Sequence, residues 1–182
     1  MNGRAPPQLF PPDPYRAISW YKRRFEMGNP EGAYTLGKLY LLGVHIDQDV
    51  ELAEKWLLIA AKAGAPDAER LLGVEYASGE RLERNLESAV LWLTPSAERG
   101  FADIQYKLAT VYEDIESHKI GSRNYSYAYK WYYLANGSDK SMYAAIRVKA
   151  AAAIDVLTKK MTPDQYAEGR KLVQEWKRSD AP

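Results

Sequence analysis

Residues 33–68 read AYTLGKLYLLGVHIDQDVELAEKWLLIAAKAGAPDA, and this stretch repeats itself along the chain. When it is shifted by 36 residues in either direction, the same residue types return at the same places. The recurring sets are Trp20, Trp56 and Trp92; Ala17, Ala53 and Ala89; Leu36, Leu72 and Leu108; Tyr40, Tyr76 and Tyr112; and Gly28, Gly64 and Gly100. A fixed period of this length indicates stacked helix pairs, each pair being one repeat.

Each repeat contains two apolar faces with the spacing of α-helices. The first face is formed by Leu36, Gly37 and Tyr40, and the second by Ala53, Trp56, Leu57, Ala60 and Ala61, because residues three and four apart share one side of a helix. Small residues at Gly37, Gly73, Ala60 and Ala61 let two helix backbones approach closely, and the Trp and Tyr rings fill the space beside them. We therefore expect Trp56 and Trp92 to be almost fully buried between successive helix pairs.

The expected ends of the second helices are periodic too. Residues suited to N-caps precede these helices at Asp13, Asp49, Asn85 and Asn124, where a side-chain oxygen can accept a bond from an unpaired helical amide. Glycines follow the helices at Gly28, Gly64 and Gly100, as expected for a left-handed residue just after a helix. Caps and core positions thus predict the same repeat boundaries.

The pattern Ala-x-x-x-Leu-Gly-x-x-Tyr-x-x-Gly, followed by Ala-x-x-Trp-x-x-x-Ala-Ala-x-x-Gly, resembles the Sel-one-like repeat (SLR), a relative of the tetratricopeptide repeat. Residues 33–68 and 69–104 carry it most fully, 13–32 is similar to the second half of a repeat, and 105–140 is a degraded repeat ending beyond Trp131. The resemblance implies an all-α fold, a right-handed α-solenoid of about three to four stacked antiparallel helix pairs.

The segments that flank the expected solenoid (13–140) have different compositions. Residues 1–12 contain four prolines and predict an extended tether. Residues 141–182 predict C-terminal capping helices: an alanine-rich helix over 141–160, then a capping box at Thr162–Gln165 that opens a charged last helix. We expect this last helix to cover the apolar side of the helix over 141–160.

Two features interrupt the repeat pattern. Pro95 falls inside an expected second helix, where it removes an amide donor and predicts a kink or an early helix end. The expected loop from Glu116 to Arg123 is longer than its counterparts. Such loops vary freely in repeat proteins, although this one is also a possible contact loop.

Composition narrows the function classes. The 182 residues carry 25 Lys and Arg against 24 Asp and Glu, a balance unlike that of nucleic-acid-binding proteins. There is no cysteine, which excludes disulfides, thiol catalysis and thiolate metal sites. The sequence shows no signal peptide and no apolar run near the ~18 residues that span a bilayer. We expect a periplasmic protein, lipid-anchored if an upstream signal and cysteine were removed, with the cytoplasm as the alternative.

Residues capable of catalysis or metal binding are sparse. The two histidines, His45 and His118, fall in expected loops outside the repeat pattern and have no metal-ligand spacing. The run Asp47-Gln-Asp-Val-Glu51 lacks the glycine and the distal glutamate of a calcium loop, so helix capping explains it better. No nucleophile motif or phosphate loop is present. We expect no enzymatic activity, no cofactor and no metal.

The expected binding surface follows from the resemblance, because first helices line the concave face in this clan. Residues that would face a protein partner there are Tyr34, Lys38, Leu41, Arg70, Val74, Ala77, Tyr106, Thr110, Glu113, Ala145 and Lys149. The tyrosine-rich stretch 125–133 adds Tyr125 and Tyr127 as candidate anchors, whereas Trp131 and Tyr132 match core positions. Tyrosine mixed with both charge signs is typical of a protein-binding groove.

The function that these features indicate is binding of one protein partner, as an adaptor or an inhibitor. One use of the family that the resemblance implies is as an immunity protein neutralising a secreted bacterial toxin. The alternative is a structural scaffold in a bacterial envelope or signalling complex. A glycan-binding protein or cell-wall enzyme is a third class, which the missing acid–base pair disfavours. We expect the chain alone to be a monomer.

Overall fold

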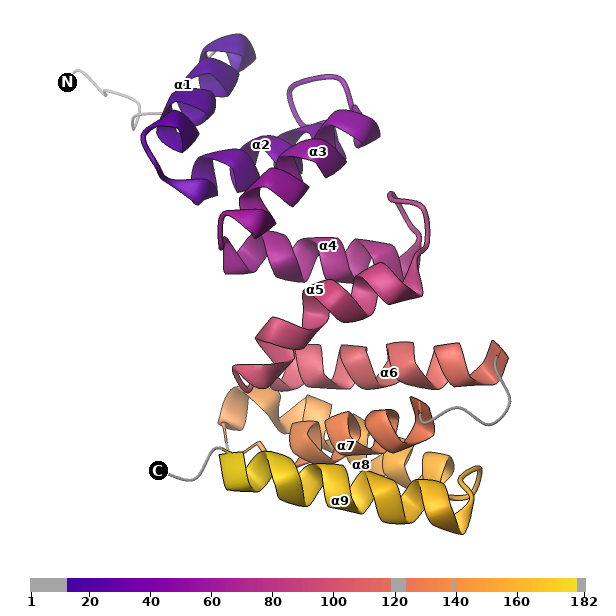
Figure 1. Cartoon of the computed structure of the whole chain (residues 1–182). Coiled ribbons are helices and arrows are strands. Elements are labelled where there is room, and N and C mark those ends of the chain that lie inside the picture. Colours follow the sequence, from indigo (N-terminus) through magenta and orange to yellow (C-terminus); the bar gives the residue numbers. More distant parts are fainter. Residues whose placement is uncertain (1–12, 119–123, 139, 180–182) are drawn as a thin grey trace, which may run out of the picture. The chain divides into compact units, whose positions relative to one another are not determined.

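In the computed structural model, residues 13–118, 124–138 and 140–179 are described, and they form helices connected by short loops (Figure 1). The elements are α1 Pro14–Glu26, α2 Pro30–Leu42, α3 Val50–Lys62, α4 Pro66–Ser78, α5 Leu86–Glu98, α6 Ala102–His118, α7 Asn124–Asn136, η1 Ser141–Tyr143, α8 Ala144–Thr158 and α9 Pro163–Ser179. No strand occurs in these ranges, so the fold is an all-α helical repeat, as predicted. The expected tether 1–12 and most of the expected contact loop lie outside the described residues.

The chain divides into two compact units, which we call unit 1 (Met1–Leu71) and unit 2 (Leu72–Pro182). In unit 1, α2 packs against both α1 and α3. In unit 2, α6 packs against α5, α7 and α8, while α7 also contacts α9. Each unit therefore has its own core of antiparallel helix neighbours.

Close approach of the paired helices depends on glycine in both units. A Cβ added at Gly37 would lie 2.6 Å from Cγ of Leu57, and one added at Gly73 would lie 2.5 Å from Cγ of Leu93. Both leucines are 0% exposed. The first and second helices of a repeat thus meet where a leucine of one occupies the space that a side chain would need on the other.

The predicted helix ends are confirmed for the first three second helices. Asp13, Asp49 and Asn85 accept bonds from the amides of Tyr15, Leu52 and Ser88 at 2.9, 2.9 and 2.8 Å. Gly28, Gly64 and Gly100 have φ angles of +85°, +84° and +82°. Asn124, the fourth expected cap, is the first residue of α7.

The burial of the repeat tryptophans differs from the prediction. Trp56 and Trp92 are only half-buried, and Trp20 is 55% exposed. The residue that points at the paired helix is the following leucine, Leu57 or Leu93, and one position on a helix corresponds to a rotation of about 100°. The expectation that Trp56 and Trp92 are almost fully buried was therefore wrong, although Phe25 lies edge-on to Trp56 at a centroid distance of 6.2 Å.

Tryptophan burial is different in α7, the last helix of the repeat array, where Trp131 is 3% exposed. Here α7 is covered by α8 and by α9, instead of α9 covering α8 as the sequence suggested. Ser126 Oγ donates to the carbonyl of Gln165 at 2.9 Å, and a Cβ at Gly169 would lie 2.9 Å from the Tyr129 ring. The capping box itself is confirmed, with reciprocal bonds between Thr162 and Gln165 at 2.9 and 3.2 Å.

Two helix boundaries also differ from the prediction. α5 continues past Pro95 to Glu98, and the amide of Arg99 still donates to the Pro95 carbonyl at 3.2 Å, so the proline does not end the helix early. α6 extends to His118, which places this histidine in a helix and not in a loop. At Pro95 the carbonyl that loses its helical donor is that of Leu91, a residue on the exposed side of α5.

Candidate functional site

The candidate site is a groove in unit 2, formed by two adjoining depressions that share Glu113; we call it the Glu113 groove. One depression, of about 360 Å³, is lined by Ala77, Lys107, Thr110, Val111, Glu113, Asp114, Tyr125 and Lys160. The other, of about 420 Å³, is lined by Tyr106, Glu113, Tyr132, Lys149, Ala152, Ala153 and Val156. Most of these residues lie on α6 and α8, two helices that contact each other.

Glu113 is held in place at the centre of the groove by two donors. Its Oε1 accepts a bond from Lys160 Nζ at 2.8 Å, and its Oε2 accepts one from the Tyr132 hydroxyl at 3.1 Å. Burial, together with the neighbouring Glu113 carboxylate, raises the pKa of Tyr132 well above its usual range. Tyr132 therefore stays protonated and donates its hydrogen bond at physiological pH.

Tyrosine rings of α6 and α7 pack against one another, and one such pair, Tyr106 and Tyr132, lines the groove. The ring of Tyr106 lies 5.3 Å from that of Tyr132, and the ring of Tyr112 stacks on that of Tyr127 at 5.2 Å. Burial, with a smaller contribution from the Tyr127 hydroxyl, raises the pKa of Tyr112 to about 12. Rings packed in this way are rigid and already partly desolvated, as is common where protein partners bind.

The structure brings together only part of the predicted binding set. Tyr106, Thr110, Glu113 and Tyr125 line the Glu113 groove, as does Lys149. Tyr127 instead stacks on Tyr112, and Val74 is half-buried on α4. Ala77 lines the groove as well, whereas Ala145 is exposed on α8 outside the groove lining. The other predicted residues, Tyr34, Lys38, Leu41 and Arg70, lie in unit 1 and are described separately.

Among the unit 1 residues, Leu41 is a wrong prediction because its side chain is 1% exposed. The loop after α2 turns back onto the helix end there: Gln48 Nε2 donates to the Leu41 carbonyl at 2.8 Å. Lys38 is exposed, and Tyr34 and Arg70 are half-buried. Arg70 forms an ion pair with Asp67. Burial and, to a lesser degree, Asp67 raise the pKa of Tyr34.

Several groove residues were missed by the sequence reasoning. Lys107, Lys160 and Val156 do not fall at the repeat positions that were projected onto the concave face. Lys107 follows Tyr106 directly, and Val156 lies seven residues after Lys149 on the same side of α8. That helical spacing was the available signal for Val156, whereas Lys160 required knowing where α8 ends.

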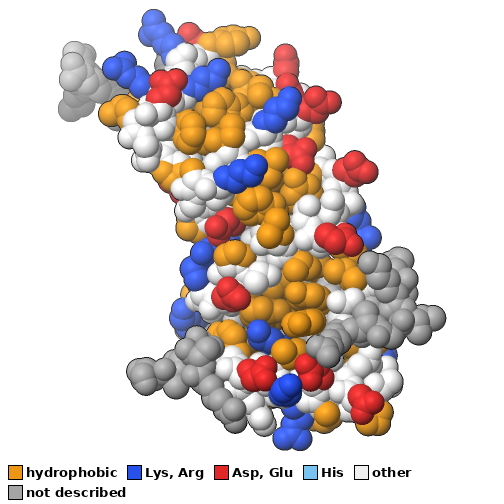
Figure 2. Space-filling view, in the orientation of Figure 1, with side chains coloured by type: hydrophobic (Ala, Val, Ile, Leu, Met, Phe, Trp, Pro, Cys, Tyr) orange, Lys and Arg blue, Asp and Glu red, His pale blue; other side chains and the backbone are white. Residues whose placement is uncertain are grey.

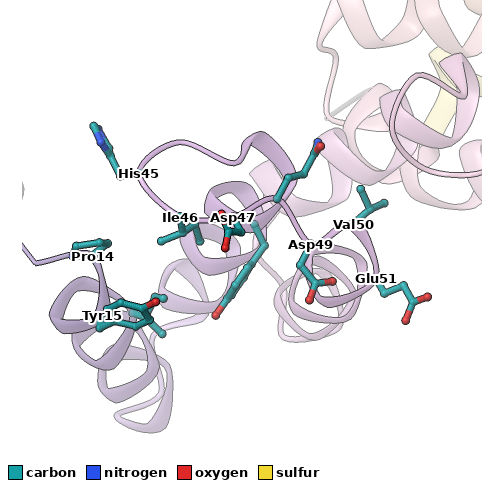
Figure 3. A pocket seen from close by; sticks show the side chains of 11 residues that line it. Pro14, Tyr15, His45, Ile46, Asp47, Asp49, Val50 and Glu51 are labelled. Atoms are coloured by element: carbon teal, nitrogen blue, oxygen red, sulfur yellow. The ribbon is translucent and has the colours of Figure 1, made fainter.

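Unit 1 carries a hollow of a different kind, a pocket of about 640 Å³ between α1 and the loop that leads into α3 (Figure 3). Pro14 and Tyr15 of α1 lie on one side of it, and Asp47, Asp49 and Glu51 lie along the loop and the start of α3. We call it the Tyr15 pocket. Its charged lining is acidic apart from His45, whose φ is +68°. Asp49 is already used as the cap of α3.

The Tyr15 pocket does not gather its carboxylates around a common point. Within the described part of the chain, no three His, Asp or Glu side chains lie close enough together to hold a metal ion. Since Asp49 Oδ1 accepts the Leu52 amide, helix capping accounts for the acidic run, as the sequence reasoning preferred.

The surface of unit 2 mixes apolar and charged side chains. In the space-filling view, hydrophobic side chains gather on the visible face of this unit and are bordered by Lys, Arg, Asp and Glu (Figure 2). Exposed apolar residues include Leu91, Met142, Val148 and Val156, at 63, 77, 72 and 53%. No helix within residues 13–118, 124–138 and 140–179 is both long and apolar enough to cross a membrane.

Comparison with known proteins agrees with this architecture. The Sel1 repeat model matches residues 6–29, 30–64, 66–101 and 102–136. A solved Sel1 repeat protein from Oxalobacter formigenes is 27% identical, with a TM-score of 0.54 over 77% of this chain and 98% of its own. No curated protein sequence matches the chain.

A second solved structure is c5321, described as a protective antigen present in uropathogenic Escherichia coli strains that displays an SLR fold. It is 22% identical, with a TM-score of 0.47 over 90% of this chain, and the chain spans 41% of that protein. Proteins built from Sel1 repeats generally mediate protein–protein interaction, and the family is typically a non-catalytic scaffold. Since four matched repeats cover most of its length, this chain belongs to the Sel1 repeat family.

Proposed function

We propose that this chain is a non-enzymatic module that binds a protein partner in the Glu113 groove of unit 2. The observation that carries the proposal is the groove itself, which combines rigid tyrosine rings, apolar surface at Val156 and charges of both signs. Centrally placed aromatic and apolar anchors surrounded by polar groups are the usual composition of protein interfaces. The convergence of several predicted residues on this groove supports the choice of site.

A narrower proposal is that the module acts as an adaptor or an inhibitor with one partner. An immunity protein that neutralises a secreted toxin is one version, and a periplasmic, lipid-anchored location belongs with it; both rest on the resemblance to the family. A scaffold in an envelope or signalling complex is the alternative. The neighbouring genes separate the two, because a toxin gene favours the inhibitor and secretion or polysaccharide-assembly genes favour the scaffold.

The test of the groove uses affinity capture with the full chain and two matched variants. Val156→Glu places a charge in the groove, whereas Leu91→Glu places the same charge on the exposed side of α5; both wild-type side chains are more than half exposed. We expect one partner to be captured by the wild type and by Leu91→Glu, and to be lost with Val156→Glu. A partner retained by Val156→Glu and lost with Leu91→Glu would place binding on the second helices and contradict the proposal.

A further inference from the structure

The charges lining the Glu113 groove are unevenly satisfied. Both acids are neutralised: Glu113 by Lys160 and the Tyr132 hydroxyl, and Asp114 by an ion pair with Arg84. Two of the lysines that line the groove, by contrast, have no charged partner among the described residues. Lys107 and Lys149 make no ion pair or side-chain hydrogen bond with any residue in 13–118, 124–138 or 140–179. The charge left for a partner to meet is therefore positive.

These two lysines occur in both halves of the groove. Lys107 lines the depression that contains Tyr125, and Lys149 lines the one that contains Tyr106 and Val156. The surface beside Lys149 is apolar, since Ala152, Ala153 and Val156 line the same depression. A segment that fits this groove needs carboxylates for the two ammonium groups and at least one apolar side chain for the alanine and valine surface.

The unpaired positive charge is a property of the Glu113 groove, because the hollow in unit 1 has the opposite charge. The Tyr15 pocket has Asp47, Asp49 and Glu51 in its lining, and the described residues place no lysine or arginine there. An acidic segment would be repelled from this pocket, because like charges brought together at an interface oppose binding. The net charge of +1 also gives no general attraction for acidic molecules.

We propose that the partner enters the Glu113 groove with an acidic segment, in which Asp or Glu side chains flanked by apolar residues meet Lys107 and Lys149. This inference rests on the proposed function and names the chemical class of partner that the groove selects. Two solvent-accessible lysines beside an apolar surface add to specificity and association rate more than to the total binding free energy. Binding of this kind weakens when salt is added, because partly exposed charges are screened.

The experiment uses fluorescence anisotropy with the full chain and three labelled synthetic peptides of equal length. All three contain the same leucines, and their other positions are glutamate, glutamine or lysine. We expect the glutamate peptide to bind most tightly and to lose affinity as NaCl is raised. Lys107→Gln combined with Lys149→Gln should weaken its binding by about tenfold or more, a factor that corresponds to ~1.4 kcal/mol. The matched control, Lys55→Gln with Lys62→Gln on exposed lysines of unit 1, should leave it unchanged.

Several results would overturn the inference. They are preference for the lysine or glutamine peptide, absence of binding to all three, affinity that ignores the double substitution, and binding to phosphatidylserine vesicles instead of the glutamate peptide. The inference and the proposed function fail separately. A captured partner that is lost with Val156→Glu but unaffected by Lys107→Gln with Lys149→Gln leaves the groove as the site and removes the acidic segment. A partner insensitive to Val156→Glu removes the groove itself.

Discussion

The helices α3 of unit 1 and α7 of unit 2 hold equivalent places in the repeat but bury their tryptophans differently, while Trp92 of α5, also in unit 2, is half-buried like Trp56. In unit 1 the repeat tryptophan, Trp56, is half-buried beside Phe25, and Lys22 Nζ lies 6.0 Å from its ring centroid. In unit 2 the matching Trp131 is 3% exposed and the next residue, Tyr132, is 2% exposed. The difference arises because α7 has two further helices packed on it, α8 and α9. An equivalent position in the repeat therefore does not imply equivalent burial.

The hollows of the two units differ in the same way. The Tyr15 pocket is acidic, whereas the Glu113 groove carries Lys107 and Lys149 beside tyrosine and apolar surface. The acidic pair Asp47 and Glu51 recurs one repeat later as Glu83 and Glu87, but Asp49 and His45 are replaced there by Asn85 and Arg81. Lys107 has no counterpart either, since Leu71 stands one repeat before it. The repeat sets the backbone framework, and the side chains that differ between repeats set the surface that a partner meets.

The largest expected effect is a difference in the stability lost when Trp131 or Trp56 is replaced by alanine. Trp131→Ala should lower the free energy of unfolding by about 3–5 kcal/mol, because it empties an enclosed site. Trp56→Ala should cost clearly less, since much of its ring is already in contact with water. Urea unfolding followed by circular dichroism measures both. Equal shifts of the two midpoints would mean that Trp131 is no better enclosed than Trp56.

A smaller loss of unfolding free energy is expected at the glycine contacts between paired helices, which both units share. Gly37→Ala and Gly73→Ala should each cost about 1–3 kcal/mol, because the new methyl group would overlap Leu57 or Leu93. Adding Leu57→Ala to Gly37→Ala should restore part of the loss, a coupling that a double-mutant cycle measures. Strongly unequal costs at Gly37 and Gly73 would show that the shared framework is not energetically equivalent in the two units.

Gly64 provides the matched control for this pair. A Cβ at Gly64 meets nothing within 4 Å, so only its φ of +84° opposes substitution. Gly64→Ala should cost roughly 1–2 kcal/mol from the left-handed backbone alone. Because no side chain is displaced there, Leu57→Ala should give no rescue of Gly64→Ala, and a rescue would contradict the separation of the two glycine roles.

The smallest effect is a pH dependence that should be stronger in unit 2. Burial raises the pKa of Tyr112 and of Tyr129 to about 12. Between pH ~10 and ~12 the unfolded chain loses protons that the folded chain keeps, so stability falls as pH rises through this window. Tyr112→Phe should reduce the alkaline loss of helix signal, measured together with tyrosinate absorbance. All tyrosines titrating together near pH ~10 without loss of helix would contradict this reasoning.

The sequence predicted the framework well because its determinants are local. Asp49 caps α3 and Gly64 ends it through interactions within a few residues of each. The close contact at Gly37 was also predictable, since a glycine at a core position of a helix leaves room for the paired backbone to approach. Tryptophan burial was not predictable, because Trp56 and Trp131 differ in which distant helices pack beside them.

The roles of the lysines in the Glu113 groove were not predictable from the sequence either, because they too depend on which distant helices pack together. Lys160 is paired because the carboxylate of Glu113, 47 residues earlier in the chain, lies within 2.8 Å of its ammonium group. Lys149 lies in α8, eleven positions before Lys160, and no carboxylate among the described residues pairs with its ammonium group. Which lysine remains available to a partner therefore depends on tertiary packing, and repeat spacing alone does not reveal it.

The contrast between the two hollows leads to the most direct measurement of function. A photo-crosslinking amino acid is placed at Val156 in the Glu113 groove or at Ile46 in the Tyr15 pocket, in otherwise unchanged full chains. After illumination with the captured partner, we expect a covalent adduct from position 156 and none from position 46. Adducts from position 46 alone would place the partner on unit 1 and contradict the assignment of the Glu113 groove as the binding site.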